Sequence, residues 1–153
     1  MVKADLDALG LSAVPKTSGS SGIHIVLPLA PDTPEEAALL VAQIIATRVA
    51  DKHPREATVE RSVKARPPAA VYVDFLQNIR AKTVASVYSA RAKVGATVST
   101  PLRWDELDDS LDREDFTIET VPPRLARVGD LWAAGMKKPN SLKSVVAAAG
   151  KRR

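Results

Sequence analysis

The 153-residue sequence contains no cysteine and only two histidines, His24 and His53. The absence of cysteine excludes disulfide scaffolds, zinc fingers, iron–sulfur sites and thiol nucleophiles. Two histidines leave almost no material for a histidine-based catalytic triad or a polyhistidine metal site.

Aromatic residues and long apolar runs are also scarce. Aromatics make up 4% of the chain, so we expect an aliphatic core and no wall of rings on which nucleic-acid bases stack. No apolar run approaches the roughly 20 residues that cross a bilayer, and residues 1–10 lack the apolar segment of a secretory signal. These features predict one globular domain with a cytoplasmic location.

Charged residues are unevenly distributed along the chain, whose formal net charge is +4. Residues 48–93 are mainly basic and residues 103–130 mainly acidic, so one half could face a polyanion, although charge runs are more often solvated surface. We predict a main domain over residues 1–135 and a basic, partly disordered tail over residues 136–153. The tail has no acidic residue, and its basic residues are Lys137, Lys138, Lys143, Lys151, Arg152 and Arg153.

The N-terminal third of the sequence predicts a helix, a loop, a strand and a longer helix. A short helix ends at Gly10, residues 15–22 form a turn-rich loop, and residues 23–29 alternate as a strand with His24 opposite the aliphatic face. The longer helix is expected to start with Thr33 as N-cap, Pro34 at its first position and Glu36 in a capping box. It should stop near His53.

Shorter elements are expected in the rest of the chain. The strand at residues 71–76 has the clearest alternation, and its neighbour at 83–88 should pair with it as a hairpin or meander. Short helices are predicted to follow the cap at residues 99–101 and to fill 122–128 and 131–136. Weak strands are predicted at 58–63 and 116–118, and residues 147–153 are expected to be frayed or disordered.

A hydroxyl- and glycine-rich loop, Thr17–Gly22, and the histidine that follows it are candidates for binding an anion. Small residues let backbone amides approach a phosphate, although such loops are usually only connections. The loop is not a Walker P-loop, because it precedes a strand and lacks the Gly-Lys-Ser/Thr sequence. His24 either donates to a phosphate or is a half-buried histidine that the backbone satisfies.

Asp74 is a carboxylate inside the predicted strand at residues 71–76, where it opposes strand propensity. One interpretation is an edge strand, or an ion pair with Arg80 or Lys82. The other is a metal ligand or general base that projects from a rigid strand. The residues alone favour neither.

Several separate blocks of this sequence occur in the order found in one protein family. The blocks are Lys16–His24, Val71–Asn78, Ala81–Ala85, Tyr88–Lys93, Gly95–Leu107, Asp115–Ile118 and Gly129–Trp132. Together they resemble the polymerase domain of bacterial DNA ligase D, a member of the archaeo-eukaryotic primase superfamily that serves in non-homologous end joining. The resemblance runs from about Leu6 to Met136. We expect an α/β (α+β) fold with a mostly antiparallel mixed sheet flanked by helices.

The resemblance also implies a reaction, template-directed addition of a nucleotide to a 3′ end, supported by two Mn²⁺ or Mg²⁺ ions. It implies that Asp74 is the catalytic, metal-binding carboxylate. It further implies that the loop and its histidine grip the triphosphate, and that an Arg-x-Lys pair contacts the incoming nucleotide or the primer strand. The residues implied to bind nucleotide are Ser18, Gly22, His24, Gln77, Asn78, Arg91 and Lys93.

This sequence departs from the family at two places. Ser21 stands where the family usually has lysine, so one phosphate-binding charge is missing. The paired carboxylates of the family, Asp-x-Asp on a strand, have no counterpart, because Asp5 and Asp7 lie in a predicted helix before the loop. We therefore expect the C-terminal half of a primase-polymerase module, truncated or split and inactive alone.

Three interpretations of function remain open at this point. In the first, the chain is a DNA-repair nucleotidyltransferase half whose missing carboxylates come from a separately encoded N-terminal half. In the second, it is a non-catalytic remnant or accessory module that binds nucleotides or DNA ends. In the third, it is a gene remnant without function. The expected partners are DNA ends, a nucleoside triphosphate, the N-terminal half, a DNA ligase and a Ku-like protein. The expected location is cytoplasmic and nucleoid-associated.

Overall fold

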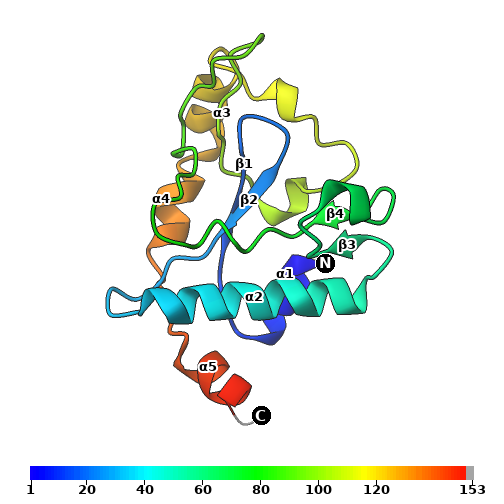
Figure 1. Cartoon of the computed structure of the whole chain (residues 1–153). Helices are drawn as coiled ribbons and strands as arrows, with labels where there is room; N and C mark the ends of the chain where they lie inside the picture. The colour runs from blue at the N-terminus through cyan, green and yellow to red at the C-terminus, as the bar shows by residue number, and fades with distance from the viewer. Residues whose placement is uncertain (151–153) are drawn as a thin grey trace. The chain divides into compact units, whose positions relative to one another are not determined.

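The computed structural model describes residues 1–150, which pack as two compact units assembled from separate stretches of chain (Figure 1). The first unit contains Met1–Leu11, Leu29–Thr83 and the described residues from Asn140 onward. The second contains Ser12–Pro28 and Val84–Pro139. Within residues 1–150, no helix has the length and apolar character needed to cross a bilayer.

A long helix, α2 (Glu35–Lys52), organises the first unit. Helices α1 (Val2–Ala8) and α5 (Lys143–Gly150) pack against it. The buried side chains of α2 recur every three or four residues, as one face of a helix requires. They are Val41, Ile45, Ala46 and Val49, and they meet Leu6 and Val145 in an aliphatic core.

The start of α2 differs from the prediction, whereas its end at His53 is confirmed. Pro34 is the N-cap residue, in extended conformation, and no side chain caps the helix. The predicted capping box is therefore wrong. Thr33 instead closes a turn, in which its backbone N–H donates to the carbonyl of Ala30 at 3.0 Å, and Glu35 and Glu36 complement the helix dipole in the first turn.

Two short strands, β3 (Ala57–Thr58) and β4 (Val71–Tyr72), pair in parallel in the same unit. The predicted strands at 58–63 and 71–76 are wrong over most of their length. The first stops at Thr58, whose hydroxyl accepts the backbone N–H of Glu60 at 3.0 Å, and a 3₁₀ turn follows at Val63–Ala65. The second stops after Tyr72 because the Asp74 carboxylate accepts the backbone N–H of Leu76 at 2.9 Å and bends the chain into a turn.

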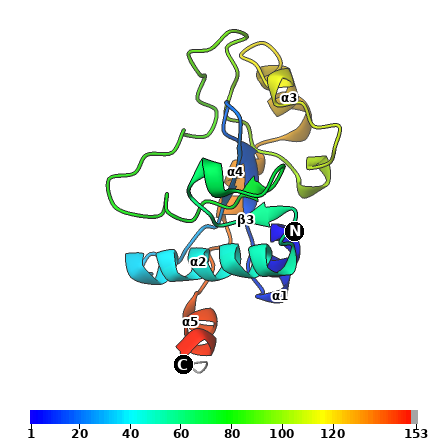
Figure 2. The ribbon, with the colours of Figure 1, turned by 45° about the vertical axis from the view of Figure 1, so that its right-hand side comes forward.

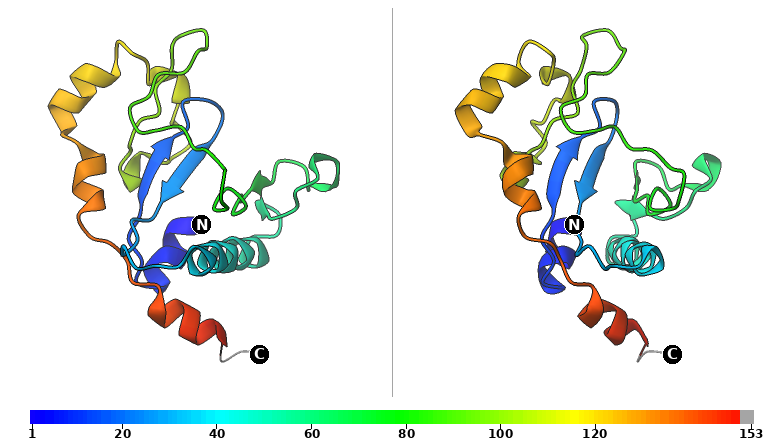
Figure 3. Two further views of the ribbon diagram at one scale, coloured as in Figure 1. Left: turned by 60° about the vertical axis from the view of Figure 1, so that its left-hand side comes forward. Right: turned by 90° about the vertical axis from the view of Figure 1, so that its left-hand side faces the viewer.

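The second unit is built on an antiparallel hairpin of β1 (Val14–Thr17) and β2 (Ile23–Val26). The predicted loop was therefore too long at its start, and the predicted strand too long at its end. Helices α3 (Val121–Val128) and α4 (Leu131–Met136) confirm two predicted helices. Helix α4 lies against β1 in both views of Figure 3.

Residues 99–102 run antiparallel beside β1 and extend the hairpin. The backbone N–H of Thr17 donates to the carbonyl of Thr100, and that of Leu102 to Pro15, both at 2.9 Å. The predicted strand at 83–88 is wrong. Figure 2 shows that the chain after β4 is irregular, and only two 3₁₀ turns, Trp104–Glu106 and Arg113–Asp115, occur before α3.

These elements confirm the predicted mixed α/β class, with helices and small sheets. The fraying expected for residues 147–150 is not observed. Residues 147–150 belong to helix α5, because Val145 is buried and anchors that helix in the first unit. Residues 151–153 lie outside the described residues, and the domain boundary at residue 135 stays a prediction.

Asp5 is a buried carboxylate that ties α1 to α2. It is 1% exposed, and its Oδ1 atom accepts hydrogen bonds from Arg48 Nε at 3.0 Å and Lys52 Nζ at 2.7 Å. Burial raises the pKa of Asp5, but the hydrogen bonds from Lys52 and Arg48 outweigh burial and hold the pKa below its usual value. Asp7 is exposed and pairs with Lys3. The two carboxylates therefore serve helix packing and surface charge.

We expect Asp5→Ala to lower the free energy of unfolding by about 1.5–3 kcal/mol, because hydrogen bonds to a buried charge are lost. The matched control in the same helix, Asp7→Ala, should cost about 0.5 kcal/mol or less. Urea denaturation measures both. Because the folded pKa of Asp5 is depressed, its contribution is present above the usual pKa of 3.8 and is lost as pH falls through the folded pKa. Equal losses for both variants would contradict this assignment.

Candidate functional site

The turn between β1 and β2 is braced from within by Ser18. Its hydroxyl oxygen accepts the backbone N–H groups of Ser20 at 3.0 Å and Gly22 at 3.1 Å. Its own N–H donates to the Gly22 carbonyl at 2.9 Å. Outside the turn, Thr97 Oγ1 donates to the Gly19 carbonyl at 2.7 Å. Ser18, which is 8% exposed, and Gly22 thus belong to a turn of fixed shape. Their binding of a triphosphate stays a prediction.

Lys16 on β1 and His24 on β2 are direct partners across the hairpin. Lys16 Nζ lies 3.1 Å from His24 Nδ1 and donates to the Ala85 carbonyl at 2.9 Å and to Ser99 Oγ at 2.6 Å. Burial, together with the charge of Arg91, lowers the pKa of Lys16 to about 8. Burial and then the charges of Lys16 and Arg91 lower the pKa of His24 below its usual value of 6.5.

Two further basic residues, Arg91 and Lys93, lie at the same turn. Lys93 Nζ donates to Ser20 Oγ at 2.6 Å, and the Cγ atom of Arg91 packs against the Gly19 backbone. We call Lys16, His24, Arg91 and Lys93 the basic cluster. Within residues 1–150, no member of this cluster forms a salt bridge with a carboxylate. Like charges gathered without a counter-ion favour the binding of an anion.

Asp74 and its neighbours form a separate exposed group in the first unit. The Asp74 carboxylate accepts from Leu76 N, from Tyr72 Oη at 3.4 Å and from Gln77 Nε2 at 3.5 Å. Asn78 Nδ2 donates to the Phe75 carbonyl at 2.9 Å. Asp74 is thus held on a turn and not on a rigid strand.

The ion pair considered for Asp74 is not formed. Arg80 lies 3.5 Å from Glu35 instead, and Asp74 makes no salt bridge with any described residue. The exposed carboxylate therefore remains available as a metal ligand. Across residues 1–150, however, no group of three or more acidic or histidine side chains could hold a metal ion. One carboxylate does not by itself fit a site for two divalent cations.

Sequence reasoning missed Lys16 as a member of the site. It entered the prediction only as the first residue of a matching block, because nothing in the spacing of Val14–Thr17 shows that all four residues of this short strand are buried. Its burial becomes visible only when residues 85 and 99 supply acceptors from distant parts of the chain. Ser21 leaves the turn one lysine short of the expected pattern. Lys16 nevertheless places a buried positive charge beside the same turn.

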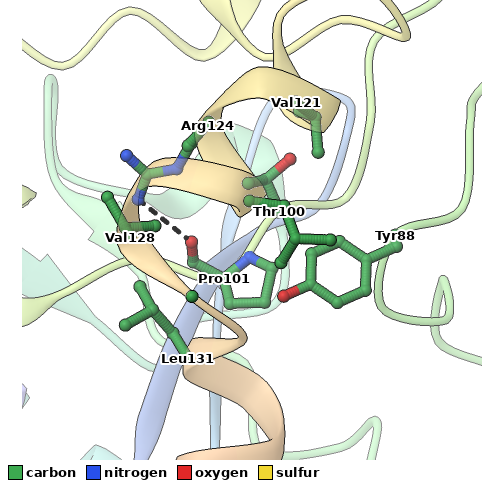
Figure 4. A pocket seen from close by; sticks show the side chains of 9 residues that line it. Tyr88, Thr100, Pro101, Val121, Arg124, Val128 and Leu131 are labelled. Carbon is green, nitrogen blue, oxygen red and sulfur yellow. Dashed lines mark hydrogen bonds between the residues drawn. The ribbon is translucent and has the colours of Figure 1, made fainter.

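A small hollow in the second unit is distinct from the basic cluster (Figure 4). Its polar groups are already paired. Arg124 bonds Glu106 at 2.7 and 2.8 Å and the Pro101 carbonyl at 3.4 Å. Tyr88 Oη donates to Asp130 at 2.8 Å, and burial followed by that carboxylate raises the pKa of Tyr88 to about 12. None of the predicted site residues lines this hollow.

Known proteins resemble this chain over most of its length. Residues 1–132 match the family described as "LigD, primase-polymerase domain". The chain is 38% identical over 130 residues to the bifunctional non-homologous end joining protein LigD of Bacillus subtilis. It is 36% identical over 125 residues to the multifunctional non-homologous end joining DNA repair protein LigD of Mycobacterium tuberculosis. These matches cover 84% and 80% of this chain, but 21% and 16% of the two relatives.

A solved structure gives the same result for the fold. The polymerase domain of Mycobacterium tuberculosis ligase D, in complex with DNA, superposes with a TM-score of 0.81 at 33% sequence identity. The superposition covers 91% of this chain and 48% of that domain. This chain therefore corresponds to about half of the solved polymerase domain.

Gly19 and Gly10 provide a matched test of the turn. Both have positive φ, 66° and 67°. A Cβ on Gly19 would lie 2.6 Å from Arg91 Cγ and 3.0 Å from Ser99 N, whereas one on Gly10 would meet nothing within 4 Å. We expect Gly10→Ala to cost about 1 kcal/mol of stability through backbone strain. Gly19→Ala should cost more and should shift the amide resonances of Arg91 and Ser99. Equal losses in urea denaturation, with unchanged resonances, would refute the tight packing.

Proposed function

Because this chain belongs to the LigD primase-polymerase domain family, we propose that it binds a nucleoside triphosphate and supplies part of a nucleotidyl-transfer site used in DNA end joining. The observation that carries the proposal is the basic cluster, which is gathered at one turn and forms no salt bridge with a carboxylate of residues 1–150. A triphosphate is an anion of the size and charge that such a cluster favours. Family membership supplies the reaction class, and the cluster supplies the binding residues.

Each residue at the turn has its own role in this proposal. Ser18 keeps the turn in one shape, with Gly22 at its end. His24, half-buried on β2, donates to a phosphate oxygen, while Arg91 and Lys93 contribute charge to the triphosphate or to the primer strand. Bringing an anion to the cluster relieves repulsion among its members, which is the physical reason for triphosphate binding here.

Asp74 is proposed as one metal-binding carboxylate of the transfer site, with Gln77 and Asn78 beside it. Mn²⁺ or Mg²⁺, when bound, would clamp the attacking and leaving oxygens of the transfer reaction. The described residues form no group of three or more acidic or histidine side chains that could hold a metal ion. We therefore propose that the remaining carboxylates come from polypeptide outside these residues, as in a split polymerase module.

A second candidate function is binding of nucleotides or DNA ends without catalysis. The basic cluster favours this function too, because a triphosphate subsite does not require metal-binding carboxylates. Residues 1–150 contain no group of three or more acidic or histidine side chains that could hold a metal ion. The two candidates share the basic cluster and differ only at Asp74. A test of transfer therefore separates them, whereas a test of triphosphate binding does not.

DNA ends are proposed as the second partner, together with a DNA ligase and a Ku-like protein. The related polymerase domain of Mycobacterium tuberculosis ligase D was solved in complex with DNA. Exposed lysines of this chain, Lys93, Lys137 and Lys138, suit contacts to phosphates that do not depend on sequence. Such a function would place the protein at the nucleoid.

We expect the chain to bind ATP through the cluster. His24→Ala should weaken binding about tenfold, the size of one hydrogen bond to a charged group. His53→Ala is the matched control, because His53 lies at the end of α2 in the other unit and should leave the affinity unchanged. Titration calorimetry measures both variants. Absence of binding by the parent chain, or equal effects of the two substitutions, would refute the triphosphate site.

We expect the 153-residue polypeptide alone not to extend a primer, even with Mn²⁺, because one carboxylate cannot clamp two cations. Addition of the Asp-x-Asp-bearing half of a relative's polymerase domain should restore extension. Asp74→Asn should abolish the restored activity, while Asp109→Asn, an exposed control, should not. Extension by the chain alone would contradict the split site. Failure of every complementation would favour the non-catalytic alternative.

A further inference from the structure

Lys16 is a buried ammonium group whose three N–H donors meet three acceptors. It is 1% exposed, and Nζ lies at hydrogen-bond distance from the Ala85 carbonyl, Ser99 Oγ and His24 Nδ1. A carbonyl oxygen only accepts. Ser99 Oγ uses its own proton to donate to the Thr17 carbonyl at 2.9 Å, so it also accepts from Lys16. The third donor of Lys16 therefore points at His24.

This arrangement determines where His24 carries its proton. Lysine in its ammonium form has no acceptor atom, so His24 Nδ1 has to accept. A neutral imidazole that accepts at Nδ1 carries its proton on Nε2. Protonation of both nitrogens would set an N–H of His24 against the Lys16 ammonium, and this is disfavoured. Burial and then the charges of Lys16 and Arg91 lower the pKa of His24, which also favours the neutral ring.

The other ring nitrogen of His24 remains free to bind a ligand. Among the described residues, Lys16 is the one hydrogen-bond partner of the His24 side chain. Because His24 is half-buried and Lys16 fully buried, an incoming anion can reach His24 Nε2, whereas the donors of Lys16 are already occupied. Lys16 therefore acts on a ligand through His24 and not by touching it.

We propose that Lys16 is a positioning residue that locks His24 as its neutral Nε2–H tautomer, so that the imidazole presents one N–H to a phosphate oxygen. The assignment of the phosphate rests on the proposed function, whereas the tautomer rests on the contacts of Lys16 alone. An alternative role for Lys16 is a structural tie from β1 to residues 85 and 99. Both roles predict a loss of stability when Lys16 is replaced, so stability does not separate them.

The tautomer can be observed directly in the unliganded full chain. Long-range ¹H–¹⁵N correlation near neutral pH distinguishes the two nitrogens of each ring, and the chain has only two histidines. His24→Gln assigns the signals and leaves His53 as the internal reference. We expect His24 to show a protonated Nε2 and an unprotonated Nδ1. A protonated Nδ1 would overturn the proposal, whatever the affinity for nucleotides.

Two variants test whether Lys16 causes the tautomer. Lys16→Met removes the donor at nearly constant length, and we expect it to release His24 into a mixture of tautomers and to raise its pKa. Thr17→Val is the structural control, because Thr17 Oγ1 joins β1 to Val98 and Thr100 by two buried hydrogen bonds. It should reduce stability but keep the Nε2–H tautomer. If both variants keep the Nε2–H tautomer, or if both show the same mixture of tautomers, Lys16 has a structural role only.

Binding of inorganic tripolyphosphate completes the test. We expect Lys16→Met to weaken binding about tenfold, because the donor at Nε2 is no longer fixed and one positive charge is lost. If the parent chain binds neither tripolyphosphate nor ATP, the proposed function fails, and the tautomer experiment still decides the role of Lys16. If the parent binds but Lys16→Met binds equally well, the positioning role is refuted and the proposed function stands.

Discussion

The buried hydrogen bonds between β1 and residues 97–102 are the interaction on which the second unit depends. Thr17 contributes its backbone N–H, its carbonyl and its hydroxyl to this contact. It is 0% exposed, as is Ser99. Each of these groups would cost free energy if it were buried without a partner. The register of the two segments is therefore fixed, and with it the position of every side chain at the neighbouring turn.

That register places the basic cluster. Arg91 N donates to the Thr97 carbonyl at 2.8 Å, so the segment that carries Arg91 and Lys93 is held beside residues 97–102. Gly19 packs directly on Val98 and Ser99. Burying Lys16 beside a second cation costs stability, because burial and then the charge of Arg91 lower its pKa to about 8. Well-satisfied polar contacts below the turn offset this cost, which is a common arrangement at ligand-binding sites.

The first unit depends on a different kind of contact. Aliphatic side chains of α1, α2 and α5 supply its core, and the buried Asp5 carboxylate fixes α1 on α2. The Asp5-Leu6-Asp7 sequence has the Asp-x-Asp pattern of a metal-binding pair, but Asp5 serves helix packing and Asp7 lies on the surface. Asp74 lies outside that core on an exposed turn, where its oxygens accept only from neighbouring residues.

The sequence by itself determined the mixed α/β class, the presence of a long helix that ends near His53 and of short helices at 122–128 and 131–136, and the family, because amphipathic spacing, turn residues and ordered motif blocks are local signals. Only the tertiary structure decided that Lys16 is buried beside His24, and that residues 99–102, not 83–88, extend the sheet. The physical reason is that hydrogen bonds between residues far apart in the chain set these features, and local periodicity carries no record of such partners.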